Sequence, residues 1–83
     1  MSRSGERLRL FVRRGCSLCE DMHAELLGLR DELGFELEVV DIDADPDLQS
    51  RYDTLVPVVR LGERDICSYF LDPVALRGAL TAQ

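Results

Sequence analysis

The stretch RRGCSLCEDMHAELL (residues 13–27) carries two cysteines three positions apart, at the junction between two different hydrophobic patterns. Residues 7–12 alternate and then become continuously apolar, as a strand does on entering the middle of a sheet with both faces covered. From Cys16 onward, apolar side chains recur at intervals of three and four, which marks the buried stripe of a helix that Gly34 ends. The stretch therefore predicts a strand, a break, and a helix that begins at the first thiol.

The residues after this helix predict a second strand and a short second helix. Residues 35–42 alternate before they become apolar, so the two strands and the helix between them form a parallel βαβ unit. Asp45 offers a capping side chain and Pro46 suits the first helical position, so a short helix begins there. This helix turns Leu48 and Tyr52 inward.

The last third of the chain predicts a β-hairpin and a final helix. Residues 55–61 are apolar and rich in β-branched side chains, residues 62–64 form a turn, and residues 65–69 return as an antiparallel partner. Asp72 and Pro73 repeat the combination of cap and proline, and the helix after them has a regular apolar face. We therefore predict an α/β fold in the order βαβαββα, with a four-stranded mixed sheet flanked by helices.

Length and charge define the class of protein. With 83 residues the chain is long enough for one domain, which we assign to residues 7–83 after a disordered lead at residues 1–6. The lead lacks the apolar stretch of a signal peptide and no apolar run is long enough to cross a bilayer, so we expect a cytoplasmic protein. A net charge of −6 argues against nucleic acid or an anionic membrane as a partner. We expect a monomer.

The two cysteines differ in their predicted chemistry. The start of a helix favours an anion, and Arg13 and Arg14 add positive charge just upstream, so Cys16 is expected to be a thiolate near neutral pH. Cys19 falls on the buried stripe of the helix. We predict that Cys16 attacks a disulfide and that Cys19 then resolves the mixed disulfide.

A proline at the start of the predicted third strand is a second signal of function. Pro57 cannot donate a hydrogen bond to a neighbouring strand, and such prolines are usually present for a specific reason. If the Val56–Pro57 bond is cis, the turn exposes the backbone of Val56 beside the thiols. An approaching peptide or thiol then pairs with it as an additional strand.

Taken together, GCSLC (15–19), VVDID (39–43) and LVPVV (55–59) in this order resemble the thioredoxin superfamily and, more narrowly, the small bacterial glutaredoxin-like proteins. The resemblance extends from residue 8 to about residue 80. It implies that Cys16 is the nucleophile, Cys19 the resolving thiol, and Val56-Pro57 the cis-proline turn on the substrate side. It also implies that Arg13 is the basic residue three positions before the nucleophile. A member of this group is a thiol-disulfide oxidoreductase without a bound cofactor, acting on disulfides of proteins or of low-molecular-weight thiols.

The chain departs from typical glutaredoxins at two places. They have proline after the first cysteine, where this chain has Ser17, and this changes the surroundings of the thiol. The Gly-Gly-Asp stretch with which they hold the glycine carboxylate of glutathione is replaced by CSYFLD (67–72), in which only Asp72 can mimic part of it. Glutathione as a co-substrate and a protein dithiol therefore both remain open as partners.

Two alternatives to the redox function remain. A zinc or copper site would need further ligands, but His23 lies two helical turns from Cys16, and Cys67 has the pattern of a small hydrophobe in the fourth strand. Copper chaperones also carry CxxC, but their order is βαββαβ. A redox-inert adaptor would keep the fold and use the Val56-Pro57 surface only for docking.

The alternating aspartates at residues 41–47 do not form a calcium loop. The sixth position holds proline where such a loop has glycine, and the twelfth holds tyrosine where it has glutamate. We predict that these acids end a strand and cap a helix, and we predict no metal site.

Overall fold

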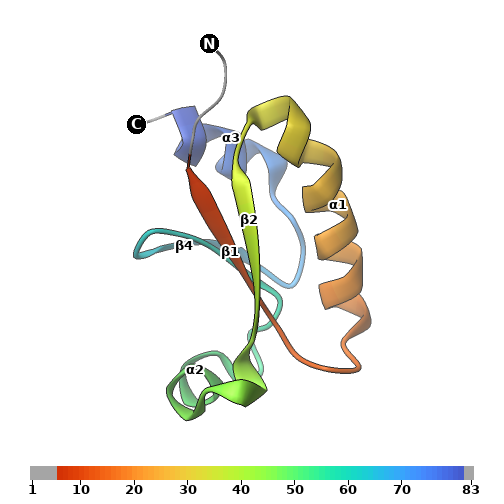
Figure 1. The fold of residues 1–83 in the computed structure, drawn as a ribbon, viewed down its shortest axis with the longest axis vertical. Coiled ribbons are helices and arrows are strands. Elements are labelled where there is room, and N and C mark those ends of the chain that lie inside the picture. The colour runs from red at the N-terminus through yellow and green to blue at the C-terminus, as the bar shows by residue number, and fades with distance from the viewer. Residues whose placement is uncertain (1–5, 82–83) are drawn as a thin grey trace.

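The computed structural model describes residues 6–81, in which helices pack against a mixed sheet of four strands (Figure 1). The elements in chain order are β1 (Arg7–Val12), α1 (Ser17–Leu33), β2 (Glu36–Asp41), the short 3-10 helix η1 (Ile42–Ala44), α2 (Pro46–Tyr52), β3 (Val58–Leu61), β4 (Arg64–Ser68) and α3 (Pro73–Thr81). The predicted order βαβαββα is confirmed, with η1 as a short addition.

Part of the predicted domain division falls outside the described residues. Residues 1–5 of the predicted disordered lead lie there, as do residues 82–83 at the end of the predicted domain. Glu6 is described, and its carbonyl accepts a hydrogen bond of 2.8 Å from the N–H of Glu36 at the start of β2.

The sheet has the strand order β2-β1-β3-β4, so β1 lies between two partners. It pairs in parallel with β2, where Leu10 is opposite Val39, and antiparallel with β3, where Leu10 is opposite Val59. Strand β4 pairs antiparallel with β3. The predicted βαβ unit and the predicted hairpin are therefore both present.

The helices begin and end where the sequence supplies suitable residues. Asp45 accepts hydrogen bonds from the N–H groups of Asp47 and Leu48 in α2. Asp72 accepts one of 3.0 Å from the N–H of Ala75 in α3. Gly34 ends α1 with a φ of 76°, a left-handed conformation that glycine adopts without steric cost. These capping predictions are confirmed.

Two hydrophobic cores lie on opposite faces of the sheet. The larger core packs α1 and α3 against one face, and its buried residues are Leu8, Leu10, Met22, Leu26, Phe35, Val59, Leu61, Leu76, Ala79 and Leu80. The smaller core lies where η1 and α2 cover one end of the other face (Figure 1), and its buried residues are Phe11, Ile42, Tyr52 and Val58. Leu10 and Phe11 are neighbours on β1 but belong to different cores, as the alternation of side chains along a strand requires.

The remainder of that second face carries charged side chains. Arg7 lies opposite Glu36 and Arg9 lies opposite Glu38 in the register of β1 and β2, and each of these two pairs forms an exposed ion pair. This arrangement matches the predicted pattern of the first strand, in which alternation comes first and both faces are covered only where the strand becomes continuously apolar, at Leu10 and Phe11.

The third strand is shorter than predicted. It begins at Val58 instead of residue 55, and Leu55 is exposed. Because Pro57 has no N–H to donate to a neighbouring strand, regular pairing begins only after it. Similarly, β2 ends at Asp41, because Ile42 already belongs to η1. Within residues 6–81, none of the helices combines the length and the apolar character that a bilayer-spanning helix needs.

Candidate active site

The first cysteine lies at the N-terminus of α1, directly after a tight turn. Gly15 has a φ of 76°, and this left-handed conformation lets the chain leave β1 and enter the helix. Cys16 is the N-cap residue of α1, and its Sγ accepts a hydrogen bond of 3.1 Å from the backbone N–H of Cys19. The N–H groups at this end of the helix and the helix dipole favour negative charge on that sulfur.

The two cysteines form a disulfide, and they differ in their access to solvent. Their Cα atoms are 5.2 Å apart. Cys19 is only 3% exposed, whereas Cys16 is half-buried. Burial of Cys19 follows from the apolar stripe of the helix, as predicted. A reactant in solvent therefore reaches Cys16 more easily than Cys19.

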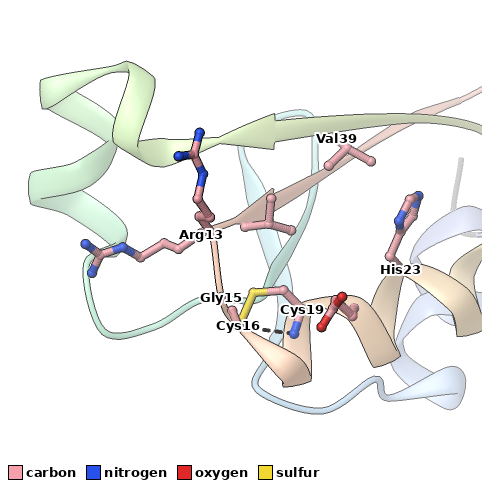
Figure 2. A pocket seen from close by; sticks show the side chains of 9 residues that line it. Arg13, Gly15, Cys16, Cys19, His23 and Val39 are labelled. Atoms are coloured by element: carbon pink, nitrogen blue, oxygen red, sulfur yellow. Dashed lines mark hydrogen bonds between the residues drawn. A yellow bond between two sulfur atoms is a disulfide. The ribbon is translucent and has the colours of Figure 1, made fainter.

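A shallow pocket of about 270 Å³ lies beside the disulfide (Figure 2). Both cysteines line it, and His23 from α1 and Val39 from β2 contribute to the same pocket. His23 follows Cys19 by four residues, a spacing that places two side chains on one side of a helix and that could have indicated this position. Val39 has no such local signal, because only the pairing of β1 with β2 brings it here.

Arg13 and Arg14 both line this pocket, but the guanidinium of Arg13 is directed away from the sulfur atoms (Figure 2). It donates a hydrogen bond of 2.8 Å to the carboxylate of Asp53 and lies 3.2 Å from a carboxylate oxygen of Asp43. The positive charge of Arg13 is thus shared by two acids next to α2. The role of Arg13 in stabilising a thiolate stays a prediction, as does that of Arg14, which is exposed.

The turn before β3 contains a cis peptide bond between Val56 and Pro57. Neither residue lines the pocket beside the disulfide. In the described part of the chain, the backbone N–H and carbonyl of Val56 form no hydrogen bond. The substrate-binding role of this turn stays a prediction.

Tyr69 holds this turn, and no sequence pattern indicated such a role. Its N–H donates a hydrogen bond of 2.9 Å to the carbonyl of Pro57, and its hydroxyl donates one of 2.9 Å to the carbonyl of Thr54. Both partners are distant in sequence, so the residues around Tyr69 contain no local signal of these contacts.

Asp72 lies next to Cys67 and does not line the pocket beside the disulfide. Its carboxylate caps α3. Burial raises the pKa of the Cys67 thiol, a hydrogen bond from the backbone of Asp72 lowers it, and the negative charge of Asp72 raises it again. The net result is a raised pKa, and Cys67 packs against the larger core from β4, which fits the predicted role of a small hydrophobe. Within residues 6–81, no group of three His, Cys, Asp or Glu side chains is arranged to hold a metal ion.

Comparison with known sequences finds relatives over almost the whole chain. The model of the glutaredoxin-like domain family (DUF836) matches residues 7–81. The chain is 30% identical over 79 residues to the uncharacterized protein Rv0508 of Mycobacterium tuberculosis, an alignment that covers 89% of this chain and 81% of that protein. The uncharacterized protein Mb0520 of Mycobacterium bovis matches to the same extent.

Comparison with solved structures leads to the same fold. Protein Ne2328 from Nitrosomonas europaea, solved by NMR in solution, is 39% identical, with a TM-score of 0.79 over 90% of this chain and 89% of that one. The oxidized mitochondrial thioredoxin 3 of Saccharomyces cerevisiae is 20% identical, with a TM-score of 0.70 over 99% of this chain and 82% of that one. At 20% identity the second likeness shows the fold alone, which is the predicted thioredoxin-like α/β fold.

Proposed function

The chain belongs to the glutaredoxin-like domain family, and we propose that it is a thiol-disulfide oxidoreductase acting on disulfides of proteins or of low-molecular-weight thiols. The observation that carries this proposal is the Cys16–Cys19 disulfide at the N-terminus of α1, with one sulfur half-buried and the other buried. The two cysteines are only three residues apart, so their bond restricts the unfolded chain far less than a bridge across a long loop does. A role in chemistry therefore explains this disulfide better than a role in stability.

The first step begins with the reduced protein. The thiolate of Cys16 attacks one sulfur of the substrate disulfide, so a bond forms between Cys16 Sγ and that sulfur while the substrate S–S bond breaks. The other substrate sulfur leaves as a thiolate and takes a proton from water. The N–H of Cys19, 3.1 Å from Cys16 Sγ in the disulfide form, supports the attacking thiolate.

In the second step the mixed disulfide is resolved within the protein. The thiol of Cys19 loses its proton to water, and the resulting thiolate attacks Cys16 Sγ. The Cys16–Cys19 bond forms as the bond to the substrate breaks, and the remaining substrate sulfur leaves as a thiolate and is protonated. Two electrons have then passed from the protein to the substrate, which ends as two thiols.

The substrate-side turn supports this cycle. The backbone of Val56 is free of hydrogen bonds to residues 6–81, and an extended substrate chain would pair with it as an added strand. We assign substrate contact to Val56 and Pro57 on this ground. The assignment of Asp72 to substrate binding has weaker support, because its carboxylate already caps α3.

Recycling requires an electron donor of the thiol class. A dithiol protein or a low-molecular-weight thiol such as glutathione would reduce the Cys16–Cys19 disulfide by the reverse exchange, and no cofactor is needed in that cycle. We place the activity in a monomer in the cytoplasm, where such disulfides are transient.

The decisive experiment is a redox titration of the metal-free protein in glutathione buffers, with free thiols alkylated and counted by mass. A Cys67→Ser variant is the matched control. We expect both proteins to form one intramolecular disulfide between Cys16 and Cys19 at the same defined potential. If the pair stays reduced across the physiological range and the purified protein retains zinc or copper, the metal-binding function replaces the proposal. If the pair stays reduced across that range and the protein retains neither metal, the redox-inert adaptor function replaces it.

A further inference from the structure

A second groove, smaller than the pocket beside the disulfide, runs between α1 and the loop that joins β4 to α3. Its volume is about 130 Å³. Leu18, Asp21 and Glu25 line it from α1, and Tyr69, Phe70 and Leu71 line it from the loop. Pockets for small molecules usually measure about 300 to 1,000 Å³, so this groove suits a single side chain better than a whole small molecule.

Two residues that line the groove, one on each wall, link it to the proposed active site. Leu18 lies between Cys16 and Cys19 in the sequence, at the start of α1. Tyr69, on the opposite wall, donates its N–H to the carbonyl of Pro57, in the turn that leaves the backbone of Val56 unpaired. A polypeptide bound at Val56 with its cysteine at Cys16 would therefore run past this groove.

The loop presents an aromatic side chain to solvent in a defined position. Tyr69 has a φ of 67°, which is uncommon for a residue other than glycine, and its N–H and hydroxyl are both hydrogen-bonded. The N–H of Phe70 donates a hydrogen bond of 2.7 Å to the carbonyl of Ser68. The ring that follows this turn is outward-facing, with Phe70 70% exposed. An apolar ring exposed in this way offers surface that a ligand would remove from water.

The other rim of the groove is negatively charged. Asp21 and Glu25 are exposed and lie four residues apart on α1, a spacing at which two like charges slightly destabilise a helix. Within residues 6–81, neither forms an ion pair. A cationic group on a ligand would offset this repulsion, whereas an anionic ligand would add to it.

We propose that this groove binds the segment that flanks the target cysteine of a substrate protein, with an apolar side chain against Phe70 and a lysine or arginine beside Asp21 and Glu25. The proposal rests on the oxidoreductase function and names its substrate class. The protein prefers disulfides in a basic and apolar sequence context over those of small anionic thiols.

The test is single-turnover reduction of synthetic peptide homodisulfides by the pre-reduced protein. Three peptides carry one cysteine flanked by leucine and arginine, by leucine and glutamate, or by serine and arginine, and bis(2-hydroxyethyl) disulfide is the small neutral reference. Acid quenching, alkylation and mass spectrometry measure the rate constants. The variants are Phe70→Ser and the double variant Asp21→Asn with Glu25→Gln. The control is Val74→Ser, because Val74 is 81% exposed and does not line the groove.

We expect the leucine–arginine peptide to react about fivefold faster than each of the other two peptides. The leucine–glutamate peptide lacks two weak surface charge pairs, and the serine–arginine peptide lacks one partly buried apolar side chain. The double variant should lose the preference for arginine over glutamate, Phe70→Ser should lose the preference for leucine over serine, and Val74→Ser should keep both. Equal rates with the three peptides would overturn the groove proposal and leave the oxidoreductase function intact. If the wild type reduces none of the disulfides, including the small reference, the oxidoreductase function itself fails.

Discussion

The backbone N–H of Cys19 points at the sulfur of Cys16, 3.1 Å away, so that a sulfur atom caps α1 where an oxygen of serine, threonine or aspartate is more usual. A neutral thiol accepts such a hydrogen bond weakly, whereas a thiolate accepts it strongly. The cap therefore favours the ionised form of Cys16 once the disulfide is reduced.

We expect the pKa of Cys16 in the reduced protein to lie below that of an ordinary cysteine. The rate of alkylation by iodoacetamide, measured against pH and assigned to each cysteine by mass spectrometry, gives this value directly. The same experiment in urea removes the helix and should return Cys16 to ordinary behaviour. Identical profiles for folded and unfolded protein would mean that the cap has no effect on the thiolate.

Cys19→Ser should trap the reaction after its first step. Without a resolving thiol, Cys16 stays joined to the substrate, and mass spectrometry should detect a stable mixed disulfide of one protein with one substrate thiol. Cys16→Ser should form no such adduct at the buried Cys19. The Cys67→Ser control should turn over like the wild type, and an adduct that requires Cys67 would contradict the assigned roles.

Arg13→Gln should reduce stability more than Arg14→Gln. The Arg13 side chain contacts both Asp43 and Asp53, although all three groups are partly exposed. Two such pairs contribute about 1 kcal/mol to the free energy of unfolding after allowance for solvent screening. Arg14 forms no ion pair within residues 6–81, so its loss should change that free energy by less than about 0.5 kcal/mol. Urea unfolding measures both values.

The pH profile of Cys16 alkylation in Arg13→Gln separates a structural role of Arg13 from a role in stabilising the thiolate. If Arg13 acts only through Asp43 and Asp53, then Arg13→Gln leaves the pH profile of Cys16 alkylation unchanged. A shift of that profile to higher pH in Arg13→Gln would instead show that Arg13 supports the thiolate, as predicted from its position just upstream of Cys16.

Cys67 should titrate at higher pH in the folded protein than in the unfolded protein. Burial is the main cause of its raised pKa. The folded state therefore binds the Cys67 proton more tightly than the unfolded state does. The stabilisation of the folded state by this difference is present at neutral pH. It is lost as the pH rises above the ordinary pKa of a cysteine and through the raised pKa of Cys67 in the folded protein. Alkylation of Cys67 in folded and urea-unfolded samples checks the direction. A midpoint in the folded protein at or below the unfolded one would contradict it.

Local sequence signals were sufficient for most of the fold. Gly34, Asp45 with Pro46, and Asp72 with Pro73 each determine a helix boundary through groups only a few residues away, and those boundaries were predicted from sequence. The cysteine pair was found in the same way, because its position at a helix start depends on its immediate neighbours.

Contacts between distant parts of the chain could not be predicted in this way. The partner of Arg13, Asp53, lies 40 residues further on, and Tyr69 bonds to Thr54 across 15 residues. Only the folded sheet brings these groups together. For the same reason, neither the hydrogen bonds of Tyr69 nor the contribution of Val39 to the pocket beside the disulfide could be predicted from sequence.

The division of the interior into two cores gives the two sides of the sheet unequal resistance to local opening. Within residues 6–81, the smaller core has four buried residues and is covered by η1 and a helix of seven residues, whereas α1 and α3 bury the larger core on the opposite face. Segments with few buried contacts open first and exchange their amide protons fastest. We therefore expect the η1–α2 corner, to which Arg13 is bound, to open before the helix that carries the two cysteines.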